Sequence, residues 1–281
     1  MGIEKINCDD FKELDLGENE KLFEFSSKSK PSLERNFEYP LEITSRDIKV
    51  IKFIVEMKFA SLEMVFEKFF RKTRTEEEAA SKAWAKKRLF QLQSSGFLVG
   101  VYAFSERTKF FSAGKKAYQV LRQILDPAAN LKPSSGFDQK TFVHDRLLGE
   151  LRVALEASGE VSDWLSDRLL RSNLQLTGGL TGRWVPDAII VRNTGEKKAL
   201  ELEIAQKSLA RYRQKISKYL SILRATSKER PFSKVLYLCE KENVVKILKT
   251  ETRLYPDLFL VEPLSKYELL GKTNINNKNG N

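Results

Sequence analysis

The chain has 281 residues, 41% of them hydrophobic and 31% charged, with a net charge of +11. This length is enough for two domains with separate cores. No apolar run approaches the roughly 20 residues that span a bilayer, and the start MGIEKINCDD lacks the pattern of a signal peptide. We therefore expect a cytoplasmic protein with no membrane partner. Two cysteines and one histidine argue against a disulfide framework or a zinc site, so any metal is expected to be bound by oxygen.

The charge is unevenly distributed along the chain. Residues 1–40 carry 6 Lys and Arg against 10 Asp and Glu, whereas residues 41–125 carry 17 against 9. We expect residues 1–40 to be an acidic, partly flexible arm. The basic block that follows favours a polyanionic partner such as nucleic acid.

Residues 41–125 are expected to form a first domain. Helical periodicity predicts helices over 44–57, 61–70 and 75–96, then a hairpin around the turn SERT, then a further helix. The expected N-caps are Thr44 or Ser45, Ser61 and Thr75, and Gly96 is a typical helix end. This order resembles a winged helix-turn-helix, whose third helix enters the major groove of DNA. The alternative interpretation is a helical protein-interaction module whose lysines form a solvated face.

Basic side chains on the third helix and the hairpin are the expected DNA contacts. They are Lys82, Lys86, Lys87, Arg88 and Lys109, with Lys115 and Lys116 flanking the wing. The apolar residues of the third helix, Trp84, Leu89 and Leu92, are expected to be core and not to stack on bases.

A second domain is expected over residues 141–265, after a linker at 126–140 and before a flexible tail at 266–281. Its expected elements are a helix, two strands, a helix, a strand, a short helix and a strand, at 142–159, 183–191, 198–205, 208–225, 234–239, 242–249 and 257–262. The fold class that we predict is therefore α+β, with a winged helix-turn-helix followed by an α/β domain.

The segment ALELEIAQKS, residues 199–208, alternates apolar and polar residues as a strand does. Leu200, Leu202 and Ile204 are expected to face the core. Glu201 and Glu203 then share the opposite face.

The turn before this strand brings in a third carboxylate. If NTG is a three-residue hairpin loop with Gly195 at positive φ, position 192 pairs with 196 and Asp187 falls opposite Glu201. Three clustered carboxylates repel one another unless a cation or proton compensates them. An oxygen-only set suits Mg²⁺ or Mn²⁺. The competing interpretation is an exposed, salt-bridged strand face.

These residues resemble the PD-(D/E)xK nuclease superfamily. Pro186 and Asp187 match the PD, and Glu201-Leu202-Glu203 stands at the (D/E)xK position with Glu in place of the usual Lys. Lysines of the following helix are candidates to supply the missing ammonium: Lys207, Lys215 and Lys218.

Over residues 44–262 the order of elements is similar to the replication-relaxation family of plasmid proteins, which includes the MOBC-type mobilisation relaxases. The resembling pieces, besides the winged helix, are HDRLLGEL, DWLSDRLLR, PDAII, LELEIAQKS and KISKYL. Asp167 stands where that family is expected to have Glu. His144 and Asp145, at a helix start, either join the site or cap the helix.

The resemblance implies metal-assisted cleavage or transfer of a DNA phosphodiester. Asp187 and Glu201 would hold one or two Mg²⁺ or Mn²⁺ ions, and Glu203 would bind a second ion or accept a proton. The catalytic candidates are Asp187, Glu201, Glu203, Lys207, Asp167 and His144. A positive wall for the DNA strand is expected from Arg211, Lys215 and Lys218. Tyr212 and Tyr219 are expected on the apolar side of that helix and not as nucleophiles.

The expected function is a DNA nickase or relaxase in the mobilisation and replication of plasmids or integrative elements. Its expected partner is double-stranded DNA, or a nicked or single-stranded origin site, with other transfer or replication proteins as further candidates. One alternative is a non-catalytic replication initiator or regulator with a degenerate nuclease scaffold. Another is an interaction module of a transfer complex, docked through residues 1–40.

Overall fold

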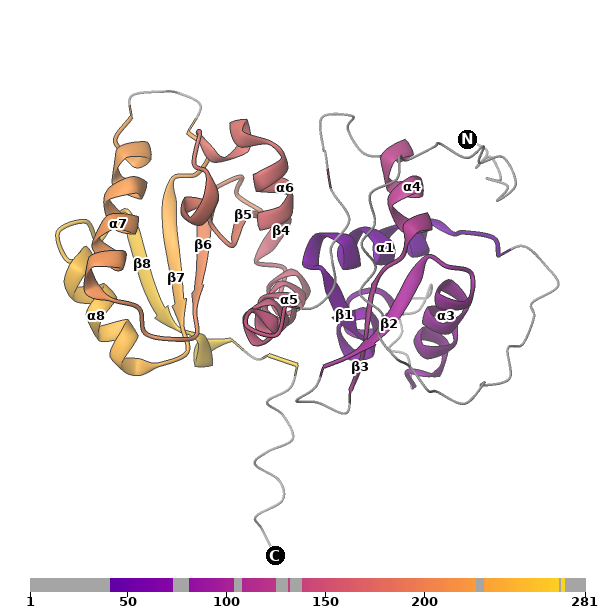
Figure 1. Cartoon of the computed structure of the whole chain (residues 1–281). Coiled ribbons are helices and arrows are strands. Elements are labelled where there is room, and N and C mark those ends of the chain that lie inside the picture. Colours follow the sequence, from indigo (N-terminus) through magenta and orange to yellow (C-terminus); the bar gives the residue numbers. More distant parts are fainter. Residues whose placement is uncertain are drawn as a thin grey trace, which may run out of the picture.

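The computed structural model describes residues 41–72, 81–103, 108–124, 131, 138–225, 230–267 and 269–270. Helices and strands are mixed and form two units that lie side by side, each with its own sheet (Figure 1). The expected acidic arm, most of the expected linker and residues 271–281 lie outside the described residues. None of the described helices has the length and apolar character needed to cross a bilayer.

The N-terminal unit combines helices with a small antiparallel sheet of strand order β1-β3-β2. Its elements are α1 (Ser45–Met57), β1 (Phe59–Ser61), α2 (Leu62–Val65), the π-helical turn η2 (Phe66–Phe70), α3 (Ala83–Ser94), β2 (Leu98–Tyr102), β3 (Lys109–Ala113) and α4 (Lys115–Ile124). The expected helices and hairpin are present. An unpredicted strand, β1, pairs with β3 and adds a third strand to the sheet.

Local signals set the ends of these helices. Thr44, and not Ser45, caps α1 through a capping box with Asp47. Ser61 caps α2. Gly96 has φ +78°, a conformation that glycine adopts without steric cost, and ends α3. The expected cap Thr75 lies outside the described residues, and α3 begins at Ala83.

The C-terminal unit is built on a five-stranded sheet of order β4-β5-β6-β7-β8. The first three strands are antiparallel, and β6, β7 and β8 are parallel. Its longer elements are α5 (Phe142–Ala157), β4 (Val161–Ser166), α6 (Asp167–Ser172), β5 (Ala188–Arg192), β6 (Lys197–Glu203), α7 (Leu209–Leu223), β7 (Lys234–Cys239), α8 (Glu242–Thr252) and β8 (Phe259–Pro263). Short 3₁₀ turns are η3 (Leu174–Thr177), η4 (Gly182–Trp184) and η5 (Leu264–Lys266).

The hairpin between β5 and β6 has the predicted register. Val191 pairs with Lys197 and Ala188 with Leu200, which places Asp187, one residue further, opposite Glu201. Gly195 has φ +81°. The expected three-residue loop and the pairing of its strands are therefore confirmed.

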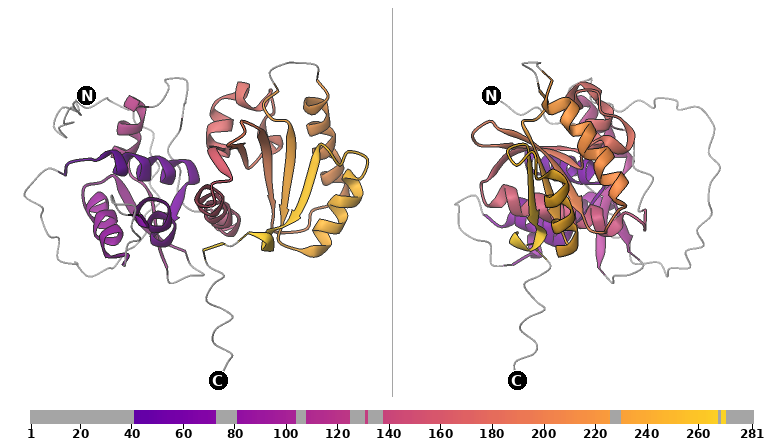
Figure 2. Two further views of the ribbon diagram at one scale, coloured as in Figure 1. Left: turned by 180° about the vertical axis from the view of Figure 1, so that it is seen from behind. Right: turned by 90° about the vertical axis from the view of Figure 1, so that its left-hand side faces the viewer.

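Helices cover both faces of the large sheet (Figure 2). Leu200 and Leu202 of β6 pack into the core that includes α5, as predicted. Glu201 and Glu203 face the layer of α7 and α8, and each is only 1% exposed. The interpretation of an exposed strand face is therefore wrong, because the parallel β6-α7-β7 connection places a helix over these carboxylates.

One of the described apolar clusters is common to both units, and a second lies within the C-terminal unit on the α7 and α8 side of the large sheet. Buried residues of α1, α5, β5 and β6 belong to a single apolar cluster. Across this contact Arg152 donates to Glu56 over 2.6 Å, Arg168 donates to the carbonyl of Val55, and Lys68 pairs with Glu156. Helix α5 thus lies between the large sheet and the N-terminal unit (Figure 1).

Candidate active site

The candidate site centres on Asp187, which precedes β5 where several elements meet. Its backbone N–H donates to Leu200, and its carbonyl accepts from the N–H of Asp167 at the start of α6. Its Oδ2 accepts from the N–H of Leu202 over 2.8 Å and from His144 Nε2 over 3.2 Å. Strands β5 and β6, α6 and α5 therefore all position this carboxylate, which remains 23% exposed.

His144 lies between two carboxylates at the start of α5. Its Nδ1 is 3.5 Å from Asp145 Oδ1, and its Nε2 faces Asp187. Burial opposes protonation of the imidazole, but the hydrogen bonds to Asp145 and Asp187 outweigh it and raise the pKa of His144 to about 10. His144 therefore lies in the candidate site, and the N-cap position of α5 is Thr141.

Glu201 is compensated from α7. Lys215 Nζ and the Tyr219 hydroxyl each donate to one oxygen of its buried carboxylate. Burial raises the pKa of Glu201 to about 7, although Lys215 opposes the shift. Burial works to lower the pKa of Lys215, but Glu201 and Asp187 outweigh it and raise that pKa. Lys215 is thus the residue of α7 whose ammonium group donates to Glu201 and whose charge also acts on Asp187.

The other two candidate lysines lie elsewhere. Lys207 donates to Glu203 Oε1 over 2.8 Å, and Lys218 is exposed. The second oxygen of Glu203 is buried without a hydrogen-bond partner among the described residues. Glu203 lies two residues after Glu201 on β6 and forms a separate ion pair with Lys207.

Asp167 faces the same cluster from α6. Burial raises its pKa; Lys58 and Arg171 oppose that rise, and the charges of Asp187 and Asp145 add to it. Its carboxylate also accepts from Arg171 over 3.4 Å. The structure therefore brings Asp167, His144, Asp187, Glu201 and Lys215 together.

The donor set fits a divalent cation only in part. Among the described residues no group of three or more His, Cys, Asp or Glu side chains is arranged to hold a metal. Asp187 and Glu201 are neighbours, but protein cations, His144 and Lys215, already compensate their charge. The expectation that Glu203 completes a three-carboxylate group therefore has no support in this geometry. The two-carboxylate pair is what a Mg²⁺ or Mn²⁺ ion would have to use.

Helix α3 presents an exposed aromatic and basic surface. Trp84 is 73% exposed, so the prediction that it belongs to the core is wrong, whereas Leu89 and Leu92 are buried as predicted. Lys86 is exposed, and Lys87 Nζ lies 5.5 Å from the Trp84 ring centre. Trp84 and Lys87 border a hollow of about 510 Å³ that lies between α1 and α3.

Arg88 was predicted to contact DNA, but its guanidinium is hydrogen-bonded within the protein. Its Nε donates to Asp47 Oδ1 over 2.8 Å, its Nη1 donates to Gln91 over 3.2 Å, and its Nη2 donates to Asp47 Oδ2 and to the backbone carbonyl of Glu42. The guanidinium ties α3 to the first turn of α1, and most of its N–H donors are used within the protein.

The remaining predicted contacts are spread over the surface. Lys82 lies 3.6 Å from Glu63, and Lys109 Nζ sits over the Phe90 ring at 4.4 Å. Burial lowers the pKa of Lys109. Arg211, Lys115 and Lys116 are exposed.

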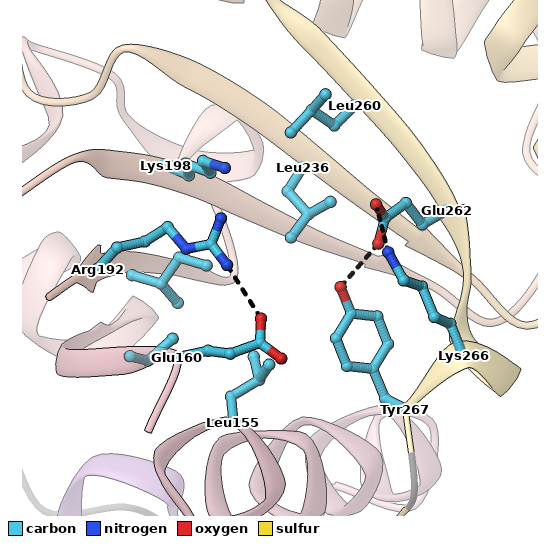
Figure 3. A pocket seen from close by; sticks show the side chains of 11 residues that line it. Leu155, Glu160, Arg192, Lys198, Leu236, Leu260, Glu262, Lys266 and Tyr267 are labelled. Carbon is cyan, nitrogen blue, oxygen red and sulfur yellow. Dashed lines mark hydrogen bonds and ion pairs between the residues drawn. The ribbon is translucent and has the colours of Figure 1, made fainter. Parts of the chain in front are cut away.

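A second cavity, of about 130 Å³, lies at the other end of the large sheet (Figure 3). Two ion pairs and a hydrogen bond line it: Arg192 donates to Glu160 over 3.0 Å, Lys266 donates to Glu262 over 2.9 Å, and the Tyr267 hydroxyl donates to Glu262 over 2.7 Å. Tyr267 is therefore packed against the domain, although the expected tail began at residue 266. None of the predicted catalytic residues lines this cavity.

Sequence reasoning missed two polar members of the site. Tyr219 was expected to be buried on the apolar side of its helix, which is confirmed, but its hydroxyl reaches Glu201. Lys58, from the N-terminal unit, contacts Asp145. No motif or spacing in the sequence points to Lys58.

Comparison of the chain with models of protein families, with curated proteins and with solved structures found no match.

Proposed function

We propose that this chain binds DNA through its N-terminal unit and cleaves or transfers a phosphodiester at the Asp187 site, as a nickase or relaxase in the mobilisation and replication of plasmids or integrative elements. The observation that carries the proposal is the position of Lys215. It brings an ammonium group from α7 to the Asp187–Glu201 pair, where the PD-(D/E)xK pattern calls for a lysine and position 203 has Glu.

The N-terminal unit supports the binding half of the proposal. Its order α1-β1-α2-α3-β2-β3 resembles that of a winged helix-turn-helix, and α3 presents Trp84, Lys86 and Lys87 to solvent. Exposed lysines beside an aromatic ring suit a phosphate backbone and its bases.

The site residues have distinct parts in the proposed mechanism. Asp187 and Glu201 would hold a Mg²⁺ or Mn²⁺ ion, whose chemistry there would be that of a Lewis acid for the phosphate and for water. Lys215 places a fixed positive charge where negative charge develops on the phosphate. His144 holds Asp187 in orientation, and the unpartnered oxygen of Glu203 is a candidate to accept a proton.

A supercoiled-plasmid assay tests the proposal. We expect the purified chain to convert supercoiled DNA carrying its target site to open circles with Mg²⁺ or Mn²⁺, and EDTA to stop the reaction. Binding of the same DNA without nicking under any of these metals would contradict the enzymatic half.

A second candidate function is a non-catalytic DNA-binding regulator with a nuclease-fold scaffold. The observation that favours it is the internal compensation of Asp187 by His144 and of Glu201 by Lys215, which leaves little need for a metal. Calorimetric titration with Mn²⁺ separates the two functions. The enzyme is expected to release heat that Glu201→Gln removes, whereas the scaffold would give none.

The double variant Lys86→Ala/Lys87→Ala is expected to weaken DNA binding and flatten its salt dependence. Each lost phosphate contact removes about 0.9 from the slope of log affinity against log salt, so two contacts remove about 1.8. Arg88 is left intact because Asp47 needs it. The matched control is Lys246→Ala/Lys249→Ala, which removes the same charge from the exposed side of α8. Equal slopes for both variants would place the DNA surface elsewhere.

Deleting residues 1–38 is expected to raise non-specific DNA affinity at low salt. The expectation rests on charge alone, because residues 1–40 carry an acidic excess and residues 41–125 a basic one. Fluorescence anisotropy with a random duplex measures it. The difference should vanish at high salt, where such charges are screened. Unchanged or lower affinity would argue against competition between these residues and phosphate.

A further inference from the structure

One lysine of the N-terminal unit reaches into the candidate site of the C-terminal unit. Lys58 follows the last residue of α1, and its Nζ lies 2.9 and 2.8 Å from the two carboxylate oxygens of Asp145. Its side chain is 29% exposed and that of Asp145 is 10% exposed. A contact this shielded is screened less by solvent than a surface ion pair.

The backbone of Lys58 is held in a conformation that L-residues disfavour. Its φ is +71° and its ψ is −40°, and it is the only residue other than glycine with positive φ in the described part of the chain. Packing on either side imposes this turn. Met57 is buried in the core, and Phe59 enters β1 opposite Ser112. A strained non-glycine residue that faces a polar cluster suggests a functional constraint.

From Lys58 a continuous chain of contacts leads to Asp187. Asp145 is held by Lys58 and by the Thr141 hydroxyl over 3.0 Å. Asp145 in turn lies against Nδ1 of His144, whose Nε2 donates to Asp187. Each group fixes the next, from the N-terminal unit to the carboxylate at the centre of the site.

We propose that Lys58 is a positioning residue for the site, so that the site is complete only when the N-terminal unit is packed against α5. Lys58 balances the charge of Asp145. Without it, the Asp145 carboxylate would lose the partner that fixes its position beside Nδ1 of His144, and the ring that contacts Asp187 through Nε2 would lose its support. Arg171 and Lys215 pair with other members of the cluster, Asp167 and Glu201. The effect on cleavage rests on the proposed function, whereas the effect on His144 does not.

The variant Lys58→Gly tests this assignment. Glycine adopts positive φ freely, so the backbone turn is retained while the ammonium is lost. We expect a fall of about 10- to 100-fold in the rate of nicking at saturating DNA, with KM unchanged, as for the loss of other groups that orient a ligand. Lys58→Arg should restore most of the rate, since it keeps the charge. Should Lys58→Gly fail to fold, Lys58→Met keeps the length without the charge and carries the same expectation.

A spectroscopic measurement tests the proposal without any activity. His144 is the only histidine of the chain, so ¹⁵N and ¹³C spectra of histidine-labelled protein report one imidazole. Lys58→Gly is expected to shift the ring signals, and the control Lys246→Ala on α8 is expected to leave them in place. Unchanged ring signals in Lys58→Gly would overturn the assignment whatever the nicking rate. A wild-type chain that does not nick would instead refute the proposed function and leave this measurement decisive for Lys58.

Discussion

Replacing Asp187 with asparagine is expected to abolish metal-dependent nicking and to leave DNA binding by α3 intact. The substitution keeps the size of the side chain and an oxygen that can accept from Leu202 N–H and His144, but it removes the negative charge that retains a hard cation. A metal supplies several kcal/mol of transition-state stabilisation, so we expect a loss of at least about 100-fold in rate. The plasmid assay measures the rate, and anisotropy with a short duplex measures binding.

The control is Asp257→Asn, which makes the same change at an exposed carboxylate between α8 and β8. It should nick at the wild-type rate. If Asp187→Asn also nicks at that rate, the Asp187 site does not perform the cleavage, and the scaffold interpretation takes its place.

Alanine at the same position separates chemistry from stability. From the sequence alone, the clustered carboxylates are expected to repel one another. Asp187→Ala should then leave the stability of the fold unchanged or raise it slightly. The contacts of Asp187 in the structure lead to the opposite expectation, a loss of stability in Asp187→Ala. Burial alone would raise the pKa of Asp187, but His144 and Lys215 lower it well below its usual range, so the carboxylate stabilises the fold. We expect Asp187→Ala to cost about 1–3 kcal/mol, because His144 and the Leu202 N–H lose their acceptor.

Short-range geometry made much of the candidate site predictable. The loop NTG fixed the register of β5 and β6 through Gly195, and this register placed Asp187 opposite Glu201. A hairpin depends on residues close in sequence, so pattern and turn chemistry suffice for it. The caps Thr44 and Ser61 were predictable for the same reason.

The wrong or missing predictions concern features that depend on contacts between residues distant in sequence. The buried stripe of α3 is Ala85, Leu89 and Leu92, at helical spacing, and Trp84 lies just outside it, so residue type misled where periodicity did not. Strand β1 has only three residues and exists through its pairing with β3.

Long-range packing also determines which lysine of α7 contacts the candidate site. Spacing placed Lys215 with Arg211 and Lys218 on one positive wall. In the fold Arg211 and Lys218 are exposed, while Lys215 turns inward beside Tyr219 to meet Glu201. Only the packing of α7 on the sheet distinguishes these residues.

Replacing Arg152 with alanine is expected to destabilise the fold by about 3–5 kcal/mol, the usual cost of breaking a buried ion pair from one side. Arg152 Nη1 donates to Glu56 Oε2 over 2.6 Å, and the Glu56 side chain is only 1% exposed. The guanidinium also lies over the rings of Phe53 and Trp164, 5.2 and 5.8 Å from their centres. Its loss would leave a buried carboxylate whose remaining ion pair, with Lys52, spans 3.7 Å and involves a half-exposed lysine. Urea unfolding followed by circular dichroism measures the change.

Two further variants show whether burial is the cause. Arg192→Ala breaks an ion pair with Glu160 in which the side chains are 39% and 46% exposed, and it should cost at most about 1 kcal/mol. The double variant Glu56→Leu/Arg152→Leu should recover much of the loss, because the buried Glu56 charge is gone and Glu156, the other partner of Arg152, keeps its pair with Lys68. Glu56 belongs to α1 and Arg152 to α5, so a shared core predicts that Arg152→Ala lowers the stability of both units in one transition. If the variant instead unfolds in two separated transitions, with the N-terminal unit at its wild-type midpoint, the two units are independent domains and Lys58 cannot be held against Asp145 by their packing.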